Sequence, residues 1–568
     1  MPHSTLPYTG FQALILCGPG ASLDTFTSSP RDLPKALLPI ANRPMVWYPL
    51  DWCYRMGVTD ITLITPPESA SAIESALATN PHLTSLPAPK PEVLAPTGLT
   101  QTTGTGEIFR LDEVAKAITT DFVVLPCDLV SELDGTEILQ TWMTLQGGLG
   151  GASHDRLSLG GEKSGRRGGL GVWYPAKNLE GISTKAEQTD FIASVALPKR
   201  APAPPQGGLR GDVGQLVMSV PKSTVKDIVE ERGTMPVRHM LLKRFGRVDM
   251  KTGHRDAHVY FFPKWVLDMM RANEFESVAE DVVGWWAKAG WQVGLGEKLG
   301  LRGVLGEKEG SDGEDMMNMS GLLEDQVDLQ GMSSTSTKVG SKGKTENGVA
   351  SRVPAAIKDA LDQEPVTVPP ILAYIQPSWA QAPEQPLIRR VDTSALLLSI
   401  SLRLAKIQSI AESTVTASTP SPLAHPAKVA HPDMMQNQSR VSEGDSLVAE
   451  NVSIESRVNI KESVIGAGCT IGSNSRLTRC LLMENVVVGE NVTLTGCILG
   501  KRCKIEGGKG KDEGTRLTEC EVQPGFVVEG GTEAKNEKFM AFEGLDEDAD
   551  MEMDDGGELD NDGIELGD

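Results

Sequence analysis

The sequence lacks the residue patterns of a zinc-binding, disulfide-bonded or secreted protein. Its eight cysteines form no CxxC pair, and no histidine stands at zinc-finger spacing, which is typical of reduced thiols in the cytosol. No basic region followed by an apolar segment and a cleavage site opens the chain. The most apolar late stretch, 394–407, is interrupted by Arg403. We therefore expect a cytoplasmic protein that is neither secreted nor inserted into a membrane.

Positive charge is scarce as well. The 568 residues include 54 Lys and Arg against 76 Asp and Glu, a formal net charge of -22, which argues against diffuse attraction to nucleic acid or anionic lipid. Much of the excess is local, because residues 543–568 hold 13 acidic residues and no basic one. We interpret 536–568 as an acidic disordered tail, with contact to basic segments of partner proteins as the second interpretation.

Apolar runs of strand length alternate with helix-length segments over the first 300 residues. Examples are 11–17, 61–65 and 121–130. Short runs that are apolar on all sides and separated by helices predict a parallel sheet with both faces covered. The fold class is thus a doubly wound, Rossmann-like α/β domain over 1–299, with a late strand that enters a helix at 257–270.

The middle of the chain changes composition twice. Residues 300–365 are rich in Gly, Ser, Lys, Glu and Met without a period, so we expect a disordered insertion. Apolar runs return at 366–410, which we interpret as a connector that goes back to the α/β domain. A Pro- and Ser-rich linker is expected at 411–440.

A repeat with a period of 17 residues follows, from 441 to 535. Aliphatic residues recur in steps of six, six and five. Equivalent positions are Val448, Ile465, Leu482 and Leu499. A triangular coil with three short strands per turn places one aliphatic residue inward on each side, and Gly466, Gly472 and Gly489 suit its corners. The pattern predicts a parallel β-helix of hexapeptide type.

Cysteines in this repeat fit the same register. Cys480 and Cys497 are one coil apart, and Cys520 joins them if six residues are inserted near 507–515. We interpret these cysteines as small stacked core residues rather than metal ligands, because free cysteine is often a buried hydrophobe.

Four motifs in the α/β domain suggest a nucleotide site. Gly18 and Gly20 follow a strand, where glycine lets backbone N–H groups approach phosphate. Lys35 lies between Pro34 and Pro39, whose rings stiffen the backbone that carries the cation.

The other two motifs come later in the chain. Gly104 belongs to a Gly-Thr-Gly segment that opens a predicted helix, where a base or phosphate could bind. Asp128 follows a buried strand at the carboxyl edge of the sheet, where such folds bind ligands, and is a candidate magnesium ligand.

In this order the motifs resemble the nucleotide-sugar pyrophosphorylase (nucleotidyltransferase) family, which often couples this domain to a left-handed β-helix. The family loop reads G-x-G-T-R-L, and Ser22 stands at the position of its arginine. Losing one such electrostatic contact typically costs roughly 10²–10³ in rate. We therefore expect a degenerate, non-catalytic domain that requires no cofactor and retains at most a site for GTP or a sugar nucleotide with magnesium.

A second resemblance covers roughly 11–533 apart from the linkers. The segments at 33–52, 369–375, 386–407 and 462–500 look like the gamma subunits of eukaryotic translation initiation factor 2B, in a fungal version. That resemblance implies a regulatory subunit of a guanine-nucleotide exchange complex. It also implies several partners, which are the epsilon subunit that carries exchange activity, the other subunits of the complex, and initiation factor 2.

Two enzyme interpretations stay open beside this one. A GDP-mannose type pyrophosphorylase fits Lys35, Asp128 and the β-helix, but not Ser22. An acyltransferase built on the β-helix would need a catalytic histidine between coils, and none follows His431.

Overall fold

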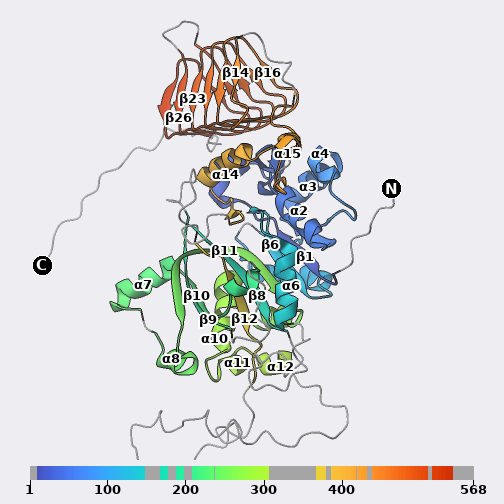
Figure 1. The fold of residues 1–568 in the computed structure, drawn as a ribbon, viewed down its shortest axis with the longest axis vertical. Coiled ribbons are helices and arrows are strands. Elements are labelled where there is room, and N and C mark those ends of the chain that lie inside the picture. The colour runs from blue at the N-terminus through green and yellow to red at the C-terminus, as the bar shows by residue number, and fades with distance from the viewer. Residues whose placement is uncertain are drawn as a thin grey trace, which may run out of the picture.

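The computed structural model describes residues 9–100, 102–146, 167–176, 187–197, 208–235, 237–305, 366–378, 385–416, 419–430, 438–508 and 514–541. An α/β domain precedes a parallel β-helix along the chain, and helix α14 (Ser394–Lys406) lies between the two (Figure 1). Most of the expected insertion, 306–365, and the tail from 542 to 568 lie outside the described residues.

A nine-stranded sheet forms the centre of the α/β domain. In spatial order its strands are β5 (Glu92–Leu94), β4 (Asp60–Ile64), β1 (Gln12–Leu16), β6 (Phe122–Pro126), β11 (Asp249–Phe262), β8 (Gly169–Pro175), β12 (Ile371–Ile375), β10 (Val213–Pro221) and β9 (Asp190–Ala196). The first four run parallel, but β11 is antiparallel to β6 and β8. The expected parallel sheet is therefore mixed, because a run that is apolar on both faces indicates burial and not strand direction.

Helices cover both faces of this sheet, as predicted. Ala13 and Ile15 of β1 belong to one apolar cluster and Leu14 and Leu16 to another, since successive side chains of a strand point to opposite faces. The first cluster includes α2 (Trp47–Met56), α3 (Pro67–Thr79), α6 (Gly135–Gln146) and α14. The second includes α5 (Asp112–Ala117), α9 (Trp265–Ala272), α10 (Gly284–Ala289), α11 (Leu295–Lys298) and α12 (Leu301–Leu305).

Shorter elements complete the domain. They are α1 (Asp24–Thr27), β2 (Pro39–Ile40), β3 (Arg43–Pro44), α4 (Pro81–Thr84), β7 (Leu129–Ser131), α7 (Lys222–Arg232), α8 (His239–Phe245), the π-helix η5 (Val278–Val283), β13 (Ile388–Arg390) and α15 (Ile410–Thr416).

The stretch expected as a connector enters the α/β domain. β12 lies between β8 and β10 in the sheet, and β13 pairs antiparallel with β7. The segment from Ser394 to Val415 is long and apolar enough to cross a membrane by length and composition alone, but half of it is buried inside the protein. Because α14 packs in the main apolar cluster and α15 is a separate helix, we interpret this segment as part of the core.

The β-helix consists of three parallel sheets. The first holds β14 (Arg440–Val441), β17 (Asn459–Lys461), β20 (Arg476–Thr478), β23 (Thr493–Thr495), β26 (Arg516–Thr518) and β29 (Glu533–Lys535). The second holds β15 (Leu447–Val448), β18 (Val464–Ile465), β21 (Leu481–Leu482), β24 (Ile498–Leu499), β27 (Glu521–Val522) and β30 (Lys538–Phe539). The third holds β16 (Ser453–Ile454), β19 (Thr470–Ile471), β22 (Val487–Val488), β25 (Lys504–Ile505) and β28 (Val527–Val528).

The register confirms the predicted period and the insertion. Ile465 pairs with Leu482, 17 residues on, and Leu499 pairs with Val522, 23 residues on, so six residues are added in that coil. The cysteines of this domain lie in its apolar core, as predicted. The glycines differ in role from the prediction. A Cβ at Gly466 would stand 2.6 Å from the backbone of the next coil, whereas corners with positive φ are often asparagines such as Asn474.

The second sheet of the β-helix packs on the α/β domain. Its first four strands, β15, β18, β21 and β24, carry two neighbouring apolar residues, because one faces the coil interior and the other, such as Val464 or Leu481, belongs to the main cluster with α14. Part of the expected linker also packs here. Nη1 and Nη2 of Arg43 donate to the carbonyls of Leu423 and Ala424 at 3.0 and 2.8 Å, so residues 419–430 form a packed segment.

Candidate functional site

The loop after β1 opens the candidate site. Gly20 has φ 80° and ψ 38°, a left-handed conformation that favours glycine. A Cβ there would also stand 3.0 Å from Cβ of Lys35. Gly18 has open space around it and lines the same cavity. Of the two predicted glycines, the backbone therefore requires only Gly20.

Two further predicted residues meet beside this loop. Asp128 lies between β6 and β7, and Lys35 begins a 3₁₀ turn, η2 (Lys35–Leu37), after Pro34. The Lys35 Nζ lies 2.7 Å from the Asp128 Oδ2, and the Asp128 side chain is fully buried. The sheet edge thus brings together two groups that are 93 positions apart in the chain.

A third charged group, missed in the sequence, completes this cluster. Arg390 ends β13, and its Nε and Nη2 lie 3.2 and 3.5 Å from Oδ1 and Oδ2 of Asp128. The backbone N–H of Val391 donates to the Asp128 carbonyl at 2.8 Å, which fixes β13 at this edge. Both carboxylate oxygens of Asp128 therefore face cations of the protein itself.

The three groups hold one another in the charged state. Burial by itself raises the pKa of Asp128, but the charges of Arg390 and Lys35 outweigh it and lower that pKa well below its ordinary value. Burial by itself lowers the pKa of Lys35 and Arg390, yet the Asp128 carboxylate raises both. At neutral pH the cluster carries two positive charges and one negative charge.

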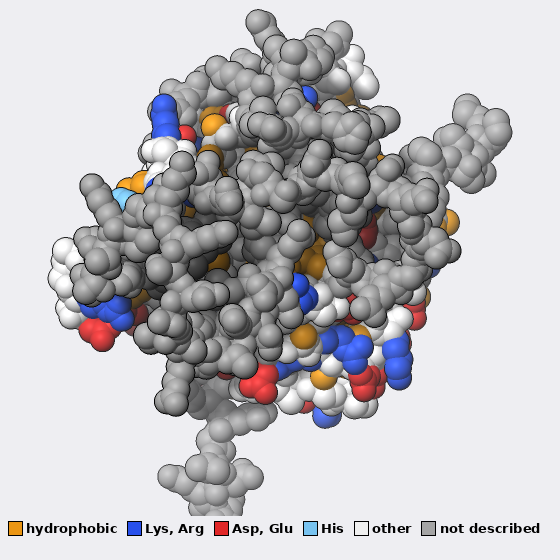
Figure 2. Space-filling model, turned by 90° about the horizontal axis from the view of Figure 1, so that it is seen from below, with side chains coloured by type: hydrophobic (Ala, Val, Ile, Leu, Met, Phe, Trp, Pro, Cys, Tyr) orange, Lys and Arg blue, Asp and Glu red, His pale blue; other side chains and the backbone are white. Residues whose placement is uncertain are grey.

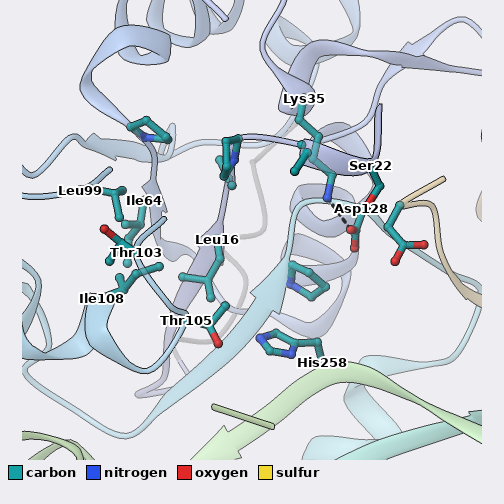
Figure 3. A pocket seen from close by; sticks show the side chains of 18 of the residues that line it. Leu16, Ser22, Lys35, Ile64, Leu99, Thr103, Thr105, Ile108, Asp128 and His258 are labelled. Atoms are coloured by element: carbon teal, nitrogen blue, oxygen red, sulfur yellow. Dashed lines mark hydrogen bonds and ion pairs between the residues drawn. The ribbon is translucent and has the colours of Figure 1, made fainter. Parts of the chain in front are cut away.

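A cavity of about 260 Å³ lies against this cluster. The side chains of Ile64, Leu99 and Ile108 gather on one side of it, and Lys35 and Asp128 lie on the other (Figure 3). Ser22, at the position of the family's arginine, also lines it and brings a hydroxyl in place of a cation. The volume is below the roughly 300–1,000 Å³ of usual ligand pockets.

His258 lines the cavity and was also missed in the sequence, where it lies inside an apolar run. Its φ of 55° falls in a β-bulge between Asp256 and Tyr260, and such strain clusters at functional sites. The side chain is buried, and its Nε2 has no hydrogen-bond partner among the residues that the structure describes. Burial, and then the charge of Arg390, lower its pKa to about 3, so the imidazole is neutral at physiological pH.

Gly104 itself does not line this cavity, although its neighbours Thr103 and Thr105 do. Its backbone N–H donates to the Glu107 carboxylate at 3.0 Å, and a Cβ there would lie 2.3 Å from the Glu276 carbonyl. The predicted helix begins as a four-residue 3₁₀ turn, η3 (Glu107–Arg110), which offers no helix N-terminus to an anion. Close packing against the backbone at Glu276 explains this glycine.

The residues at Asp128 do not fit a divalent metal ion. Magnesium needs free oxygen donors in octahedral geometry, whereas both Asp128 oxygens already contact Lys35 or Arg390. Within the described ranges, no group of three or more His, Cys, Asp or Glu side chains could hold a metal. The cavity is lined by backbone groups, by hydroxyls such as that of Ser22, and by the side chains of Lys35 and Arg390.

Two comparisons with known proteins bear on this chain. A protein-family model described as the GMPPB C-terminal domain matches residues 442–534. Over 308 residues the chain is 26% identical to the translation initiation factor eIF2B subunit gamma of Schizosaccharomyces pombe, which is 54% of this chain and 57% of that protein. The chain thus spans just over half the length of this curated relative. Both resemblances noted in the sequence are confirmed.

Proposed function

We propose that this chain is a non-catalytic gamma-type subunit of the translation initiation factor 2B exchange complex. Its role is to bind the epsilon subunit and initiation factor 2 in the cytosol and to promote GDP/GTP exchange by the partner. The similarity to an eIF2B gamma subunit supports a role as a translation initiation factor subunit. The α/β domain and β-helix together offer an extended surface for such partners.

One observation carries the non-catalytic part of this proposal. The carboxylate at Asp128 is paired with Lys35 at 2.7 Å and with Arg390 at 3.2 Å. Nucleotidyl transfer depends on cations placed where charge develops on the departing pyrophosphate. Here Lys35 and Arg390 are already paired with Asp128, and Ser22 adds no further cation. The cluster supports a structural role that joins β13 to the edge of the sheet.

The pyrophosphorylase alternative makes an opposite prediction. Such an enzyme would release pyrophosphate from GTP and mannose 1-phosphate in the presence of magnesium. We expect no release above background from the wild-type chain or from Ser22→Arg, because the restored arginine would not free Asp128. Release that is lost in Asp128→Asn would contradict the proposal.

Association with a partner is the positive test. The tagged chain is expressed together with the epsilon subunit, purified, and weighed by native mass spectrometry. We expect a complex that contains both chains. Isolation of this chain without epsilon, under conditions in which both are soluble, would refute the proposed partnership.

A further inference from the structure

Two of the eight cysteines lie side by side at the edge of the central sheet. Strands β1 and β6 are parallel neighbours, and Leu16 pairs with Pro126 at their ends. Cys17 and Cys127 are the next residues along the chain, and the N–H of Cys127 donates to the Leu16 carbonyl at 3.1 Å. Both cysteines belong to the first apolar cluster, so their side chains point to the same face of the sheet. The register therefore places the two thiols next to each other.

The two thiols are in direct contact. A side-chain hydrogen bond joins Cys17 and Cys127. Neighbouring strands of a sheet lie about 4.7–4.9 Å apart, which is within the range of about 4.4–6.8 Å between the Cα atoms of a disulfide. A disulfide can therefore form here without a large movement of either strand.

The cavity beside Lys35 and Asp128 gives this pair a route to solvent. Cys17 lines the cavity, although Cys17 and Cys127 are only 3% and 1% exposed. The cavity volume of about 260 Å³ is several times the roughly 30 Å³ that one water molecule takes up in the liquid. A small oxidant of the size of hydrogen peroxide therefore has room to reach the thiols.

The surroundings of this pair are electropositive. The cluster beside it holds two cations, Lys35 and Arg390, against the one carboxylate of Asp128. On the surface seen from below, by contrast, basic side chains lie next to acidic ones (Figure 2), and the whole chain has a net charge of -22. Reactive cysteines sit in electropositive sites, whereas cysteines buried in apolar surroundings are inert.

The two thiols differ in acidity, which suits different roles. The hydrogen bond from Cys17 lowers the pKa of Cys127, and the charges of Lys35 and Arg390 add to this effect against burial. The hydrogen bond to Cys127 and burial raise the pKa of Cys17. Cysteines that sense oxidants often have a second cysteine beside them that resolves the oxidised form. Cys127 is therefore the candidate attacking thiol, and Cys17 is the candidate resolving thiol.

We propose that Cys17 and Cys127 form a reversible oxidation site that reacts with a peroxide. The Cys127 sulfur attacks one oxygen of hydrogen peroxide, the O–O bond breaks, and water leaves with the thiol proton, so that Cys127 becomes a sulfenic acid. The Cys17 sulfur then attacks the Cys127 sulfur, the S–O bond breaks, and a second water leaves as the disulfide forms. Two thiols and one peroxide thus give one disulfide and two waters, and an added dithiol reduces the disulfide again.

The β-helix provides a matched control within the same chain. Side-chain hydrogen bonds join the thiol of Cys497 to those of Cys480 and Cys520, which belong to neighbouring coils. All three lie in the apolar core of the β-helix and are not among the residues that line the cavity. Links among them would appear within the tryptic peptide 480–501 or between this peptide and 517–535.

The test uses the full-length chain, which is reduced and then treated with hydrogen peroxide. Free thiols are blocked with iodoacetamide, and the tryptic peptides are analysed by mass spectrometry. Cys17 is the only cysteine of peptide 1–31, and Cys127 is the only cysteine of peptide 117–156, so their disulfide appears as one linked pair that dithiothreitol removes. We expect this link to form about tenfold faster than the β-helix links, because oxidation follows thiolate character and exposure.

Two variants separate the roles of the two thiols. In Cys17→Ala we expect Cys127 to gain one or two oxygen atoms, because no thiol is left to resolve its sulfenic acid. In Cys127→Ala we expect Cys17 to stay unmodified at the same peroxide concentration. Cys53→Ala removes another buried cysteine of the α/β domain and should form the link between Cys17 and Cys127 as wild type does.

Other results would overturn the inference. A link between Cys17 and Cys127 that forms no faster than the β-helix links would show that the cavity does not expose the pair. Oxygen on Cys17 in the Cys127→Ala variant, gained as fast as the wild-type link forms, would contradict attack by Cys127. The inference goes beyond the proposed function and does not depend on it, so its failure would leave the role in exchange untouched.

Discussion

The buried charge cluster gives the sharpest prediction about stability. At the observed 3.2 Å between the Arg390 Nε and the Asp128 Oδ1, the attraction is about 5 kcal/mol at an effective dielectric constant of about 20. Desolvation offsets part of this, but removing one partner of a buried pair still costs about 3–5 kcal/mol because it leaves a buried charge uncompensated. We expect Arg390→Met and Asp128→Asn each to lower the free energy of unfolding of the α/β domain by about 3 kcal/mol or more.

Tryptophan fluorescence isolates this domain, because all nine tryptophans lie before residue 380 and none lies in the β-helix. A loss of about 3 kcal/mol moves the urea midpoint by about 1 M at a slope of about 3 kcal/mol/M. The double variant should lose less than the sum of the single variants, since the two residues interact. Strictly additive losses, or single losses below about 0.5 kcal/mol, would refute the description of this cluster.

The same cluster predicts a dependence on pH. The pKa of Asp128 is lower in the folded protein than its ordinary value, so its contribution to stability is present above that ordinary value, near pH 4, and is lost as the pH falls further. The urea midpoint of wild type should therefore fall more steeply below pH 4 than that of Asp128→Asn. Parallel curves for the two proteins would contradict the paired carboxylate.

Three other substitutions test separate parts of the structure. Gly20→Ala places a Cβ at positive φ near Lys35 and should lower the urea midpoint, whereas Gly18→Ala, in open space, should not; equal effects would contradict the loop geometry. Burial raises the pKa of Asp190 to about 7, so stability should fall as pH rises from about 4 to 7, and Asp190→Asn should flatten that slope. Arg43→Met removes two donors to the carbonyls of residues 423–424 and should lower the free energy of unfolding by about 1.5–3 kcal/mol. Limited proteolysis should also cut 419–430 faster in this variant. Unchanged cleavage would show that other contacts hold this segment.

The β-helix could be predicted from sequence almost coil by coil. Its strands pair with the equivalent strands of the next coil, so the period of the sequence repeat is enough to predict which residues pair. The added six residues before Cys520 were visible because the aliphatic positions resume in phase after them. The role of Gly466 could not be read in this way, because the approach of the next coil at 2.6 Å depends on three-dimensional stacking.

The candidate site was predictable only in part. The order of motifs indicated that Lys35 and Asp128 would approach one sheet edge. The contact of Arg390 with Asp128 could not be predicted, because Arg390 lies 262 positions further along the chain, on a strand that pairs with β7. The available signal for a second counter-ion was the Arg-Arg pair at 389–390, which stands inside an apolar run.

Local patterns misled where tertiary contacts decide the conformation. The segment after Gly104 was predicted as a helix with a free N-terminus, but the Glu107 side chain takes the N–H of Gly104. His258 looked like a residue of an ordinary strand, yet it lies in a bulge with φ 55°. In both cases the neighbouring elements, and not the local sequence, set the backbone geometry.

The central claim is that this chain assists exchange by a partner and has no nucleotidyl-transfer chemistry of its own. The most direct measurement is the rate of GDP release from purified initiation factor 2 with this chain alone, with the epsilon subunit alone, and with the two together. The account predicts no acceleration by this chain alone and faster release by the pair than by epsilon. Equal rates for epsilon with and without this chain would contradict it.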